Sequence, residues 1–269
     1  MELLREETYR RIADLMYGTV GLSLPESKKM LISYRLGPRI QKLGLAGFDS
    51  YVDLLAEESV DGELQVAIDL LTTHETYFFR ESRHFGLIER EFAARKPGAL
   101  AVWSAATSFG DEAYSVAMVL ADMARRGALT DAWSVLATDV SDSALRCAVE
   151  GVYPADRLRD VSPDRLRRYC LRGEGEAEGL IRIGDALREH VRFGWCNLCQ
   201  PLDDLECFDV IFLRNVLIYF DVPTKRAVLN RVLERLSCGG LFFVGSAEGR
   251  IHCDWKMDAL MPGAFRKAE

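Results

Sequence analysis

Acidic side chains stand at two points of the sequence where a buried strand is predicted to end. Asp111 and Glu112 close a short loop that follows the apolar run 99–105. Asp139 ends the next apolar run along the chain. Short, continuous apolar runs are typical of strands buried on both faces of a parallel sheet. The loop and Asp139 are therefore expected at the carboxyl edge of one sheet, where ligands of open α/β sheets bind.

The composition of the loop, residues 106–112, narrows the class of ligand. A dinucleotide site would carry glycines in the order G-x-G-x-x-G, so that backbone amides close on a pyrophosphate. Here a single glycine, Gly110, is followed by Asp111 and Glu112, and two carboxylates would repel a diphosphate. They are compatible with a ligand that carries ribose hydroxyls and a positive charge, such as S-adenosylmethionine. On the loop alone, it is equally open that both carboxylates only favour a helix N-terminus.

The elements around the loop form a β-α-β unit. Residues 113–126 place apolar side chains on one helical face, and these are Val116, Leu120, Met123 and Ala124. Further buried strands are predicted over 191–198, 208–213 and 241–244, with a helix over 223–236 and a final edge strand over 264–267. Strands that alternate with helices predict an α/β fold with a doubly wound, Rossmann-like sheet.

The chain before this sheet is predicted to be helical. Apolar residues recur three or four apart over 4–18, 27–36, 48–57 and 62–71. Lys96-Pro97-Gly98 marks the boundary with the first strand, so we expect an all-helical N-terminal domain over 1–92 and a second domain over 93–269. Residues 154–190 interrupt the α/β alternation and are expected to form an inserted β subdomain with a small strand pair.

A basic helical segment lies within the N-terminal domain. If residues 26–42 form one helix, its basic side chains share a face, and these are Lys28, Arg35, Arg39 and Lys42. Gly37-Pro38 is expected to kink or split this helix. The face is either an ordinary solvated surface or a docking surface for an acidic partner.

Composition excludes several classes of protein. The 269 residues are 49% hydrophobic and 28% charged, with a net charge of -7, which is typical of a soluble globular protein and argues against nucleic acid as the main partner. No apolar run reaches the roughly 18 residues of a membrane span, and no signal peptide is recognisable, so we expect a cytoplasmic protein. The seven cysteines fit reduced thiols. Cys196 and Cys199 form a C-x-x-C without a second pair, which favours packing over a zinc site.

Five stretches of the chain resemble the signature motifs of one family, in matching order and spacing. They are residues 71–81 (L-T-T-H-E-T-Y-F-F-R-E), 102–115 (V-W-S-A-A-T-S-F-G-D-E-A-Y-S), 137–139 (A-T-D), 208–221 (F-D-V-I-F-L-R-N-V-L-I-Y-F-D) and 240–248 (G-L-F-F-V-G-S-A-E). The family is that of the CheR-type chemotaxis receptor methyltransferases. The resemblance runs from about residue 5 to the end of the chain.

The resemblance implies an activity and roles for individual residues. Such enzymes transfer a methyl group from S-adenosylmethionine to glutamate side chains on receptor signalling helices, leaving S-adenosylhomocysteine. By resemblance, the cofactor contacts are His74, Thr76, Arg80, Glu112, Asp139, Asn197, Leu198, Arg214 and Asn215. Arg80 and Tyr219 fall where the family lines the site of methyl transfer. The basic face matches the family's docking surface for receptor helices, and residues 154–190 match a subdomain that in some members binds a receptor tail peptide. A monomer is expected.

Three departures from the family's pattern keep alternatives open. His74 replaces an asparagine, Ser246-Ala247 replaces a His-Ser pair, and the loop carries Ala106-Thr107 and a bulky Phe109. Phe109 is expected to crowd the methionine end of the ligand. One alternative is a non-catalytic binding or scaffold protein in a signalling array, and another is a methyltransferase of the same fold that acts on a small molecule.

Overall fold

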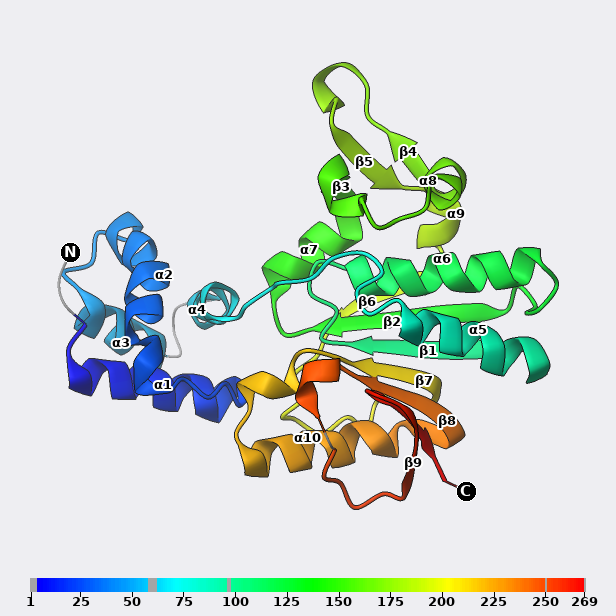
Figure 1. The fold of residues 1–269 in the computed structure, drawn as a ribbon. Helices are drawn as coiled ribbons and strands as arrows, with labels where there is room; N and C mark the ends of the chain where they lie inside the picture. The colour runs from blue at the N-terminus through cyan, green and yellow to red at the C-terminus, as the bar shows by residue number, and fades with distance from the viewer. Residues whose placement is uncertain (1–3, 58–61, 96–97, 250, 269) are drawn as a thin grey trace.

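A sheet of seven strands lies at the centre of the molecule, in the order β6-β2-β1-β7-β8-β10-β9 (Figure 1). The computed structural model describes residues 4–57, 62–95, 98–249 and 251–268. The parallel strands are β1 (Leu100–Ala105), β2 (Trp133–Asp139), β6 (Val191–Trp195), β7 (Phe208–Leu213) and β8 (Leu236–Val244). The chain runs outward from β1 in both directions, so the predicted doubly wound sheet is confirmed.

The end of the chain differs from the prediction. Strand β10 (Ala264–Lys267) is not an edge strand, because it lies antiparallel between β8 and β9 (Met257–Met261). Strand β9 was not predicted, because its residues are largely exposed and carry no clear apolar alternation. A turn through Gly263, which has a φ of 75°, reverses the chain and brings β10 against β8.

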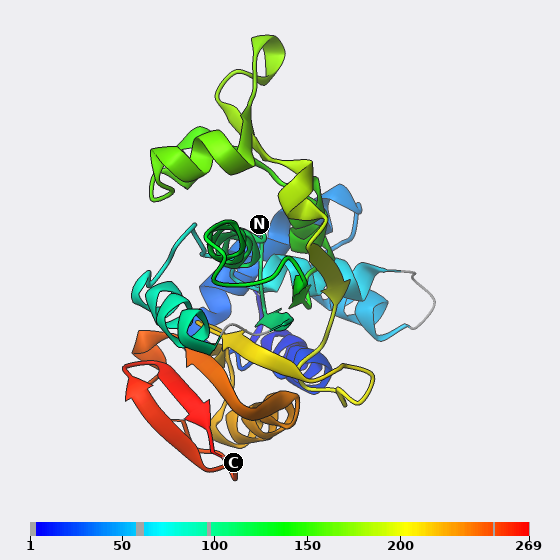
Figure 2. The same ribbon diagram turned by 90° about the vertical axis from the view of Figure 1, so that its right-hand side faces the viewer.

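Helices cover both faces of the sheet (Figures 1 and 2). On one face, α5 (Arg83–Arg95) and α6 (Asp111–Arg125) pack on the strands, and on the other face lies α10 (Val222–Glu234). Helix α7 (Asp142–Glu150) follows β2, and its N-cap is Ser141, whose side chain accepts a hydrogen bond from the Ala144 amide. Because β1, β2 and β7 are parallel, their carboxyl ends lie at one edge of the sheet.

The N-terminal helices form a second hydrophobic core. They are α1 (Glu6–Val20), the 3-10 helix η1 (Glu26–Lys28), α2 (Lys29–Lys42), α3 (Phe48–Ala56) and α4 (Glu63–Leu71). Helix α2 is not split at Gly37-Pro38, because Leu36 and Ile40 on either side are buried in this core and hold the helix together. The predicted domain boundary at residue 92 stays a prediction. Lys96 and Pro97, which were expected to mark it, lie outside the described residues. Helix α5, just before them, contributes to the hydrophobic core of the sheet.

The insertion forms a small sheet that projects from the main body (Figure 2). It holds three strands in the order β3-β5-β4, where a pair was predicted. Its elements are β3 (Val152–Pro154), the 3-10 helix η2 (Ala155–Leu158), α8 (Pro163–Tyr169), β4 (Cys170–Arg172), the 3-10 helix η3 (Gly175–Ala177), β5 (Leu180–Ile183) and α9 (Asp185–Arg188). The third strand was missed because β3 begins before residue 154 and is very short. Within the described ranges, no helix has the length and apolar character needed to span a bilayer.

Candidate functional site

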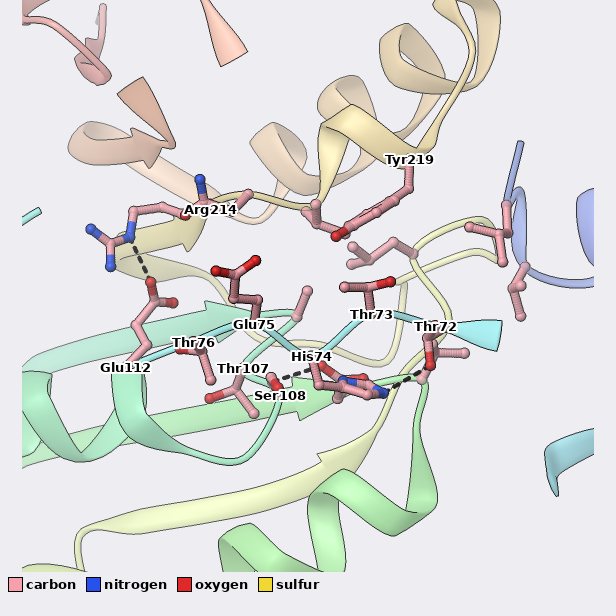
Figure 3. Close-up of a pocket in the computed structure, with 18 of the residues that line it drawn as sticks. Thr72, Thr73, His74, Glu75, Thr76, Thr107, Ser108, Glu112, Arg214 and Tyr219 are labelled. Atoms are coloured by element: carbon pink, nitrogen blue, oxygen red, sulfur yellow. Dashed lines mark hydrogen bonds and ion pairs between the residues drawn. The ribbon is translucent and has the colours of Figure 1, made fainter. Parts of the chain in front are cut away.

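A pocket lies at the carboxyl ends of β1, β2 and β7 (Figure 3). It brings together every residue predicted to contact the cofactor, namely His74, Thr76, Arg80, Glu112, Asp139, Asn197, Leu198, Arg214 and Asn215. Tyr219, predicted for the site of methyl transfer, lines the same pocket. Residues separated by more than a hundred positions in sequence thus share one cavity. Whether each contacts a bound cofactor stays a prediction.

The loop after β1 has an unusual backbone. Ala106 and Ser108 adopt φ angles of 71° and 55°, and Gly110 adopts 88°. A non-glycine residue in this region costs about 1–3 kcal/mol and persists only where its surroundings hold it. The amides of Ala106 and Thr107 both donate to the Thr138 carbonyl, at 2.8 and 2.9 Å. The loop is therefore tied to the end of β2, and its shape depends on contacts from other elements.

Asp139 also holds the loop, through hydrogen bonds to its carboxylate. Its buried carboxylate accepts hydrogen bonds from the Ser108 amide (2.7 Å) and the Ser141 amide (3.0 Å). Burial raises the pKa of Asp139, while the Ser141 amide and His74 act in the opposite direction. Each carboxylate oxygen keeps a further lone pair. Asp139 can therefore hold the loop and still accept hydroxyl groups from a ligand.

Glu112 and Arg214 form a buried ion pair on the opposite wall of the pocket. Arg214 Nε donates to Glu112 Oε2 at 2.6 Å, and the Ser104 hydroxyl donates to Oε1 at 2.7 Å. Arg214 Nη1 also donates to the Arg80 carbonyl (2.8 Å) and lies 3.2 Å from Nδ1 of His84. Burial lowers the pKa of His84, as does Arg214. Because a guanidinium can only donate, Nδ1 of His84 is the acceptor in this contact. The network fixes Glu112 and the backbone of Arg80 relative to each other.

Two buried hydroxyl groups beside the pocket indicate that it suits a polar ligand. Thr107 Oγ1 and Ser108 Oγ are buried and find no hydrogen-bond partner among the described residues. Both residues line the pocket, and a buried hydroxyl without a partner costs free energy. A ligand with donors and acceptors would satisfy them, and the carboxylates of Glu112 and Asp139 suit a cation and a ribose. The residues present therefore fit S-adenosylmethionine. Thr107 and Ser108 were predicted to lie in the loop, but no ligand contact was predicted for them.

The segment after α4 forms another wall. His74 Nε2 lies 2.8 Å from Thr72 Oγ1, and burial lowers the pKa of His74. Arg80 Nη1 donates to the Glu75 carbonyl at 2.8 Å. The Glu75 carboxylate, which the sequence analysis did not single out, points into the pocket on the side facing Tyr219 (Figure 3).

The turn after β7 carries Asn215 and Tyr219. The Glu248 carboxylate accepts hydrogen bonds from two backbone amides of this turn, Asn215 N at 2.8 Å and Leu217 N at 2.7 Å. Burial raises the pKa of Glu248, although these amides oppose the shift. Asn215 has a φ of 60°, in the left-handed region that asparagine tolerates. Glu248, at the end of the motif over 240–248, therefore stabilises the turn through these amides.

The end of α1 closes the pocket from the helical domain. Val20 and Leu22 line it, and no feature of the sequence pointed to them, because they belong to an ordinary amphipathic helix end. Asn197 donates through Nδ2 to the Thr19 carbonyl (2.7 Å), and its Oδ1 accepts from the Cys199 amide at 3.0 Å. The Asn197 side chain therefore joins the two domains at the rim of the pocket.

Phe109 does not crowd the pocket as expected. Among the described residues that line the cavity, Phe109 is absent. Its ring packs edge-on against His74, with centroids 5.4 Å apart, and lies under the Arg157 guanidinium at 4.8 Å. The expectation is wrong because the left-handed backbone of Ser108 turns the next residue towards the insertion.

The four basic residues predicted for docking divide into two kinds. Lys28 and Lys42 are exposed. Arg35 Nη1 donates inward to the Leu71 and Thr72 carbonyls at 2.9 and 2.8 Å. Arg39 pairs with the buried Glu63. The docking surface stays a prediction, but two of its members also hold the helical domain together.

Replacing Arg39 by glutamine should lower the free energy of unfolding by about 1–3 kcal/mol. Glu63 is buried, accepts from Arg39 Nε at 3.0 Å and from the Tyr51 hydroxyl at 2.7 Å, and would lose its cation. Arg39 holds the pKa of Glu63 below its ordinary value, so this stabilisation is present at neutral pH and is lost as the pH falls through the lowered pKa. Urea unfolding measures it. Lys42→Gln, on the same helix but exposed, is the control, and equal midpoints for both variants would contradict the assignment.

The cysteines of the chain are free thiols. Burial raises the pKa of Cys196 and of Cys199, and Cys199 Sγ donates to the Val20 carbonyl at 3.4 Å. In the part of the chain that the structure describes, no cluster of three or more histidine, cysteine, aspartate or glutamate side chains is arranged to hold a metal ion.

Comparison with known proteins places these features in a family. Residues 7–72 match the description "CheR methyltransferase, all-alpha domain", and residues 74–257 match "CheR methyltransferase, SAM binding domain". The chain is 39% identical over 252 residues to a chemotaxis protein methyltransferase of Escherichia coli, covering 93% of this chain and 87% of that one. It is 37% identical to chemotaxis protein methyltransferase 2 of Pseudomonas aeruginosa, covering 91% and 88%.

Proposed function

The chain belongs to the CheR methyltransferase family of S-adenosylmethionine-dependent enzymes, and we propose that it methylates glutamate side chains on chemoreceptor signalling helices. The observation that carries the proposal is one pocket in which two buried carboxylates, Glu112 and Asp139, lie with Arg80 and Tyr219. The carboxylates suit the cofactor, and the other two side chains suit a carboxylate substrate. The product is a glutamate methyl ester.

The cofactor side of the proposal rests on complementary charge. When bound, S-adenosylmethionine supplies a methyl group on a positively charged sulfur. Asp139, at the end of β2, accepts the ribose hydroxyls, and Glu112, held by Arg214, faces the cationic methionine end. Thr107 and Ser108 offer hydroxyls that have no other hydrogen-bond partner within the described part of the chain. Val20 and Leu22 add apolar lining to the pocket, which disfavours water beside the reacting atoms.

The substrate side requires positioning and no strong base. The attacking carboxylate is already ionised: its oxygen forms the new bond to the methyl carbon while the electron pair of the broken carbon–sulfur bond returns to sulfur. No proton is transferred. Arg80 attracts the substrate carboxylate, and the Tyr219 hydroxyl, which faces the pocket (Figure 3), aims the acceptor oxygen. Holding the two reactants in line supplies most of the rate enhancement.

The partner side of the proposal concerns surfaces outside the pocket. The basic face of Lys28, Arg35, Arg39 and Lys42 attracts acidic receptor helices in the cytoplasm, chiefly through the exposed Lys28 and Lys42, since Arg35 and Arg39 also bind groups of the helical domain. In addition, the outer strands β3 and β4 of the inserted sheet are short, and an extended receptor tail could pair with one of them. The chain acts as a monomer in this proposal.

The test is a methyl-transfer assay with the purified chain. Radiolabelled S-adenosylmethionine and a chemoreceptor cytoplasmic fragment should give labelled receptor that releases methanol in base, as a glutamate methyl ester does. A fragment with its acceptor glutamates replaced by aspartates is the control. Binding of S-adenosylhomocysteine without any labelled receptor would favour the scaffold alternative and overturn the proposal.

Tyr219→Phe should lower kcat about tenfold, because one aiming hydrogen bond is lost, and leave the KM for the cofactor within about twofold. Tyr9→Phe is the matched control, since it removes a hydroxyl that donates to the Leu24 carbonyl at 2.6 Å within the helical domain. Steady-state kinetics of both variants decide the matter. An unchanged kcat in Tyr219→Phe would remove Tyr219 from the site of methyl transfer.

A further inference from the structure

The loop over 106–112, here called the cofactor loop, also makes contacts on its side away from the pocket. Two residues of the insertion reach it: Tyr153 of β3 and Arg157 of η2. The Tyr153 hydroxyl donates to the Phe109 carbonyl at 2.6 Å. Gly110 passes so close to Tyr153 that an added Cβ would lie 3.1 Å from its hydroxyl oxygen. The insertion therefore touches the loop at the two residues that lead into α6.

Arg157 makes the stronger of these contacts. Its Nε and Nη2 donate to the two carboxylate oxygens of Asp111, at 2.7 and 3.0 Å, and the Asp111 side chain is fully buried. The same guanidinium covers the ring of Phe109, which in turn packs on His74 at the pocket wall. A chain of direct contacts thus leads from η2 to the cavity. A bidentate pair with a buried carboxylate fixes geometry as well as energy.

We infer that Arg157 is a positioning residue for cofactor binding, through which the inserted subdomain holds the strained loop over 106–110 in its ligand-ready shape. Arg157 itself does not line the pocket among the described residues, so its effect must pass through Asp111 and Phe109. The inference rests on the cofactor that the family uses and is independent of which receptor is methylated. Because coupling is reciprocal, cofactor binding must also stabilise the part of the insertion around Arg157.

Arg168 offers a matched control. It also reaches from the insertion to α6, where its Nη1 donates to Asp122 Oδ1 at 3.2 Å. Asp122 lies three turns of helix beyond the cofactor loop. Arg157→Gln and Arg168→Gln therefore each remove a guanidinium that joins the insertion to the same helix, but only one of them touches the loop.

The experiment is calorimetric titration with S-adenosylhomocysteine. Arg157→Gln should raise the Kd about tenfold or more, with kcat at saturating cofactor close to that of the wild type. Arg168→Gln should lower the melting temperature and leave the Kd within about twofold. Arg157→Lys, which keeps a charge beside Asp111 but loses the bidentate geometry, should fall between. A wild-type Kd in Arg157→Gln would overturn the inference.

Hydrogen exchange of the wild-type protein decides the matter if Arg157→Gln does not fold. Saturating S-adenosylhomocysteine should slow the exchange of amides in 153–158 and leave those in 164–172 unchanged. Equal exchange in 153–158 with and without ligand would contradict the coupling. Wild-type binding of S-adenosylhomocysteine without receptor methylation would overturn the proposed function alone, so the two failures are distinguishable.

Discussion

Replacing Asp139 by asparagine should raise the Kd for S-adenosylhomocysteine about a hundredfold, which corresponds to roughly 2.8 kcal/mol. The carboxylate accepts from the Ser108 and Ser141 amides through different oxygens. An asparagine puts an amide NH₂ at one of these positions, where it cannot accept. One backbone amide then loses its partner, and one ribose hydroxyl loses a charged acceptor. The loop and the ligand site are weakened by the same change.

Calorimetry against the wild type measures this loss, with Asp142→Asn as the matched control. Asp142 lies in the first turn of α7, only three residues further along, and carries the same charge. The control should bind S-adenosylhomocysteine within about twofold of the wild type. A Kd for Asp139→Asn within about threefold of the wild-type value would show that Asp139 does not hold the ribose.

Replacing Arg214 by methionine should lower the free energy of unfolding by about 3–5 kcal/mol. The Arg214 side chain is 2% exposed and pairs with Glu112. Without Arg214, Glu112 would be a buried charge whose one remaining side-chain partner, among the residues that the structure describes, is the Ser104 hydroxyl. The Arg80 carbonyl would also lose its donor. Urea unfolding followed by tryptophan fluorescence gives the midpoint and the slope. The variant should fail to bind S-adenosylhomocysteine with wild-type affinity, because Glu112 is no longer held.

A double variant separates the buried charge from the loss of packing. Adding Glu112→Gln to Arg214→Met removes the unpaired carboxylate, so the double variant should be more stable than Arg214→Met alone. Glu112→Gln by itself should be destabilised, since the buried guanidinium then keeps only the more distant carboxylate of Glu81, 3.8 Å away, among the described residues. Strictly additive effects of the two single changes would show that the ion pair contributes no coupling energy.

The parallel strands of the fold could be predicted from the local pattern of apolar residues in the sequence. Runs such as 99–105 are apolar without interruption because both faces of the strand are buried, and this pattern alone predicts the strand. Asp139 and the loop over 106–112 stand directly after such runs, so their place at one edge of the sheet follows from topology. Spacing of apolar residues likewise predicted the helices α1 to α4. Strand β9 and the third strand of the insertion were not predicted, since short exposed strands show little periodicity of apolar residues.

The contacts between distant segments could not be derived in this way. Three such contacts depend on how separate elements pack. Val20 and Leu22 line the pocket, Arg39 pairs with Glu63, and Phe109 turns away from the cavity. A side chain has the same type and local spacing whether it faces a ligand or a neighbouring helix. The residues and their order determined the sheet, the helical domain, the family and the edge of the sheet at which the pocket lies. Only the tertiary structure decided which charges are paired inside the protein, because pairing is a property of distance in space, which sequence separation does not measure.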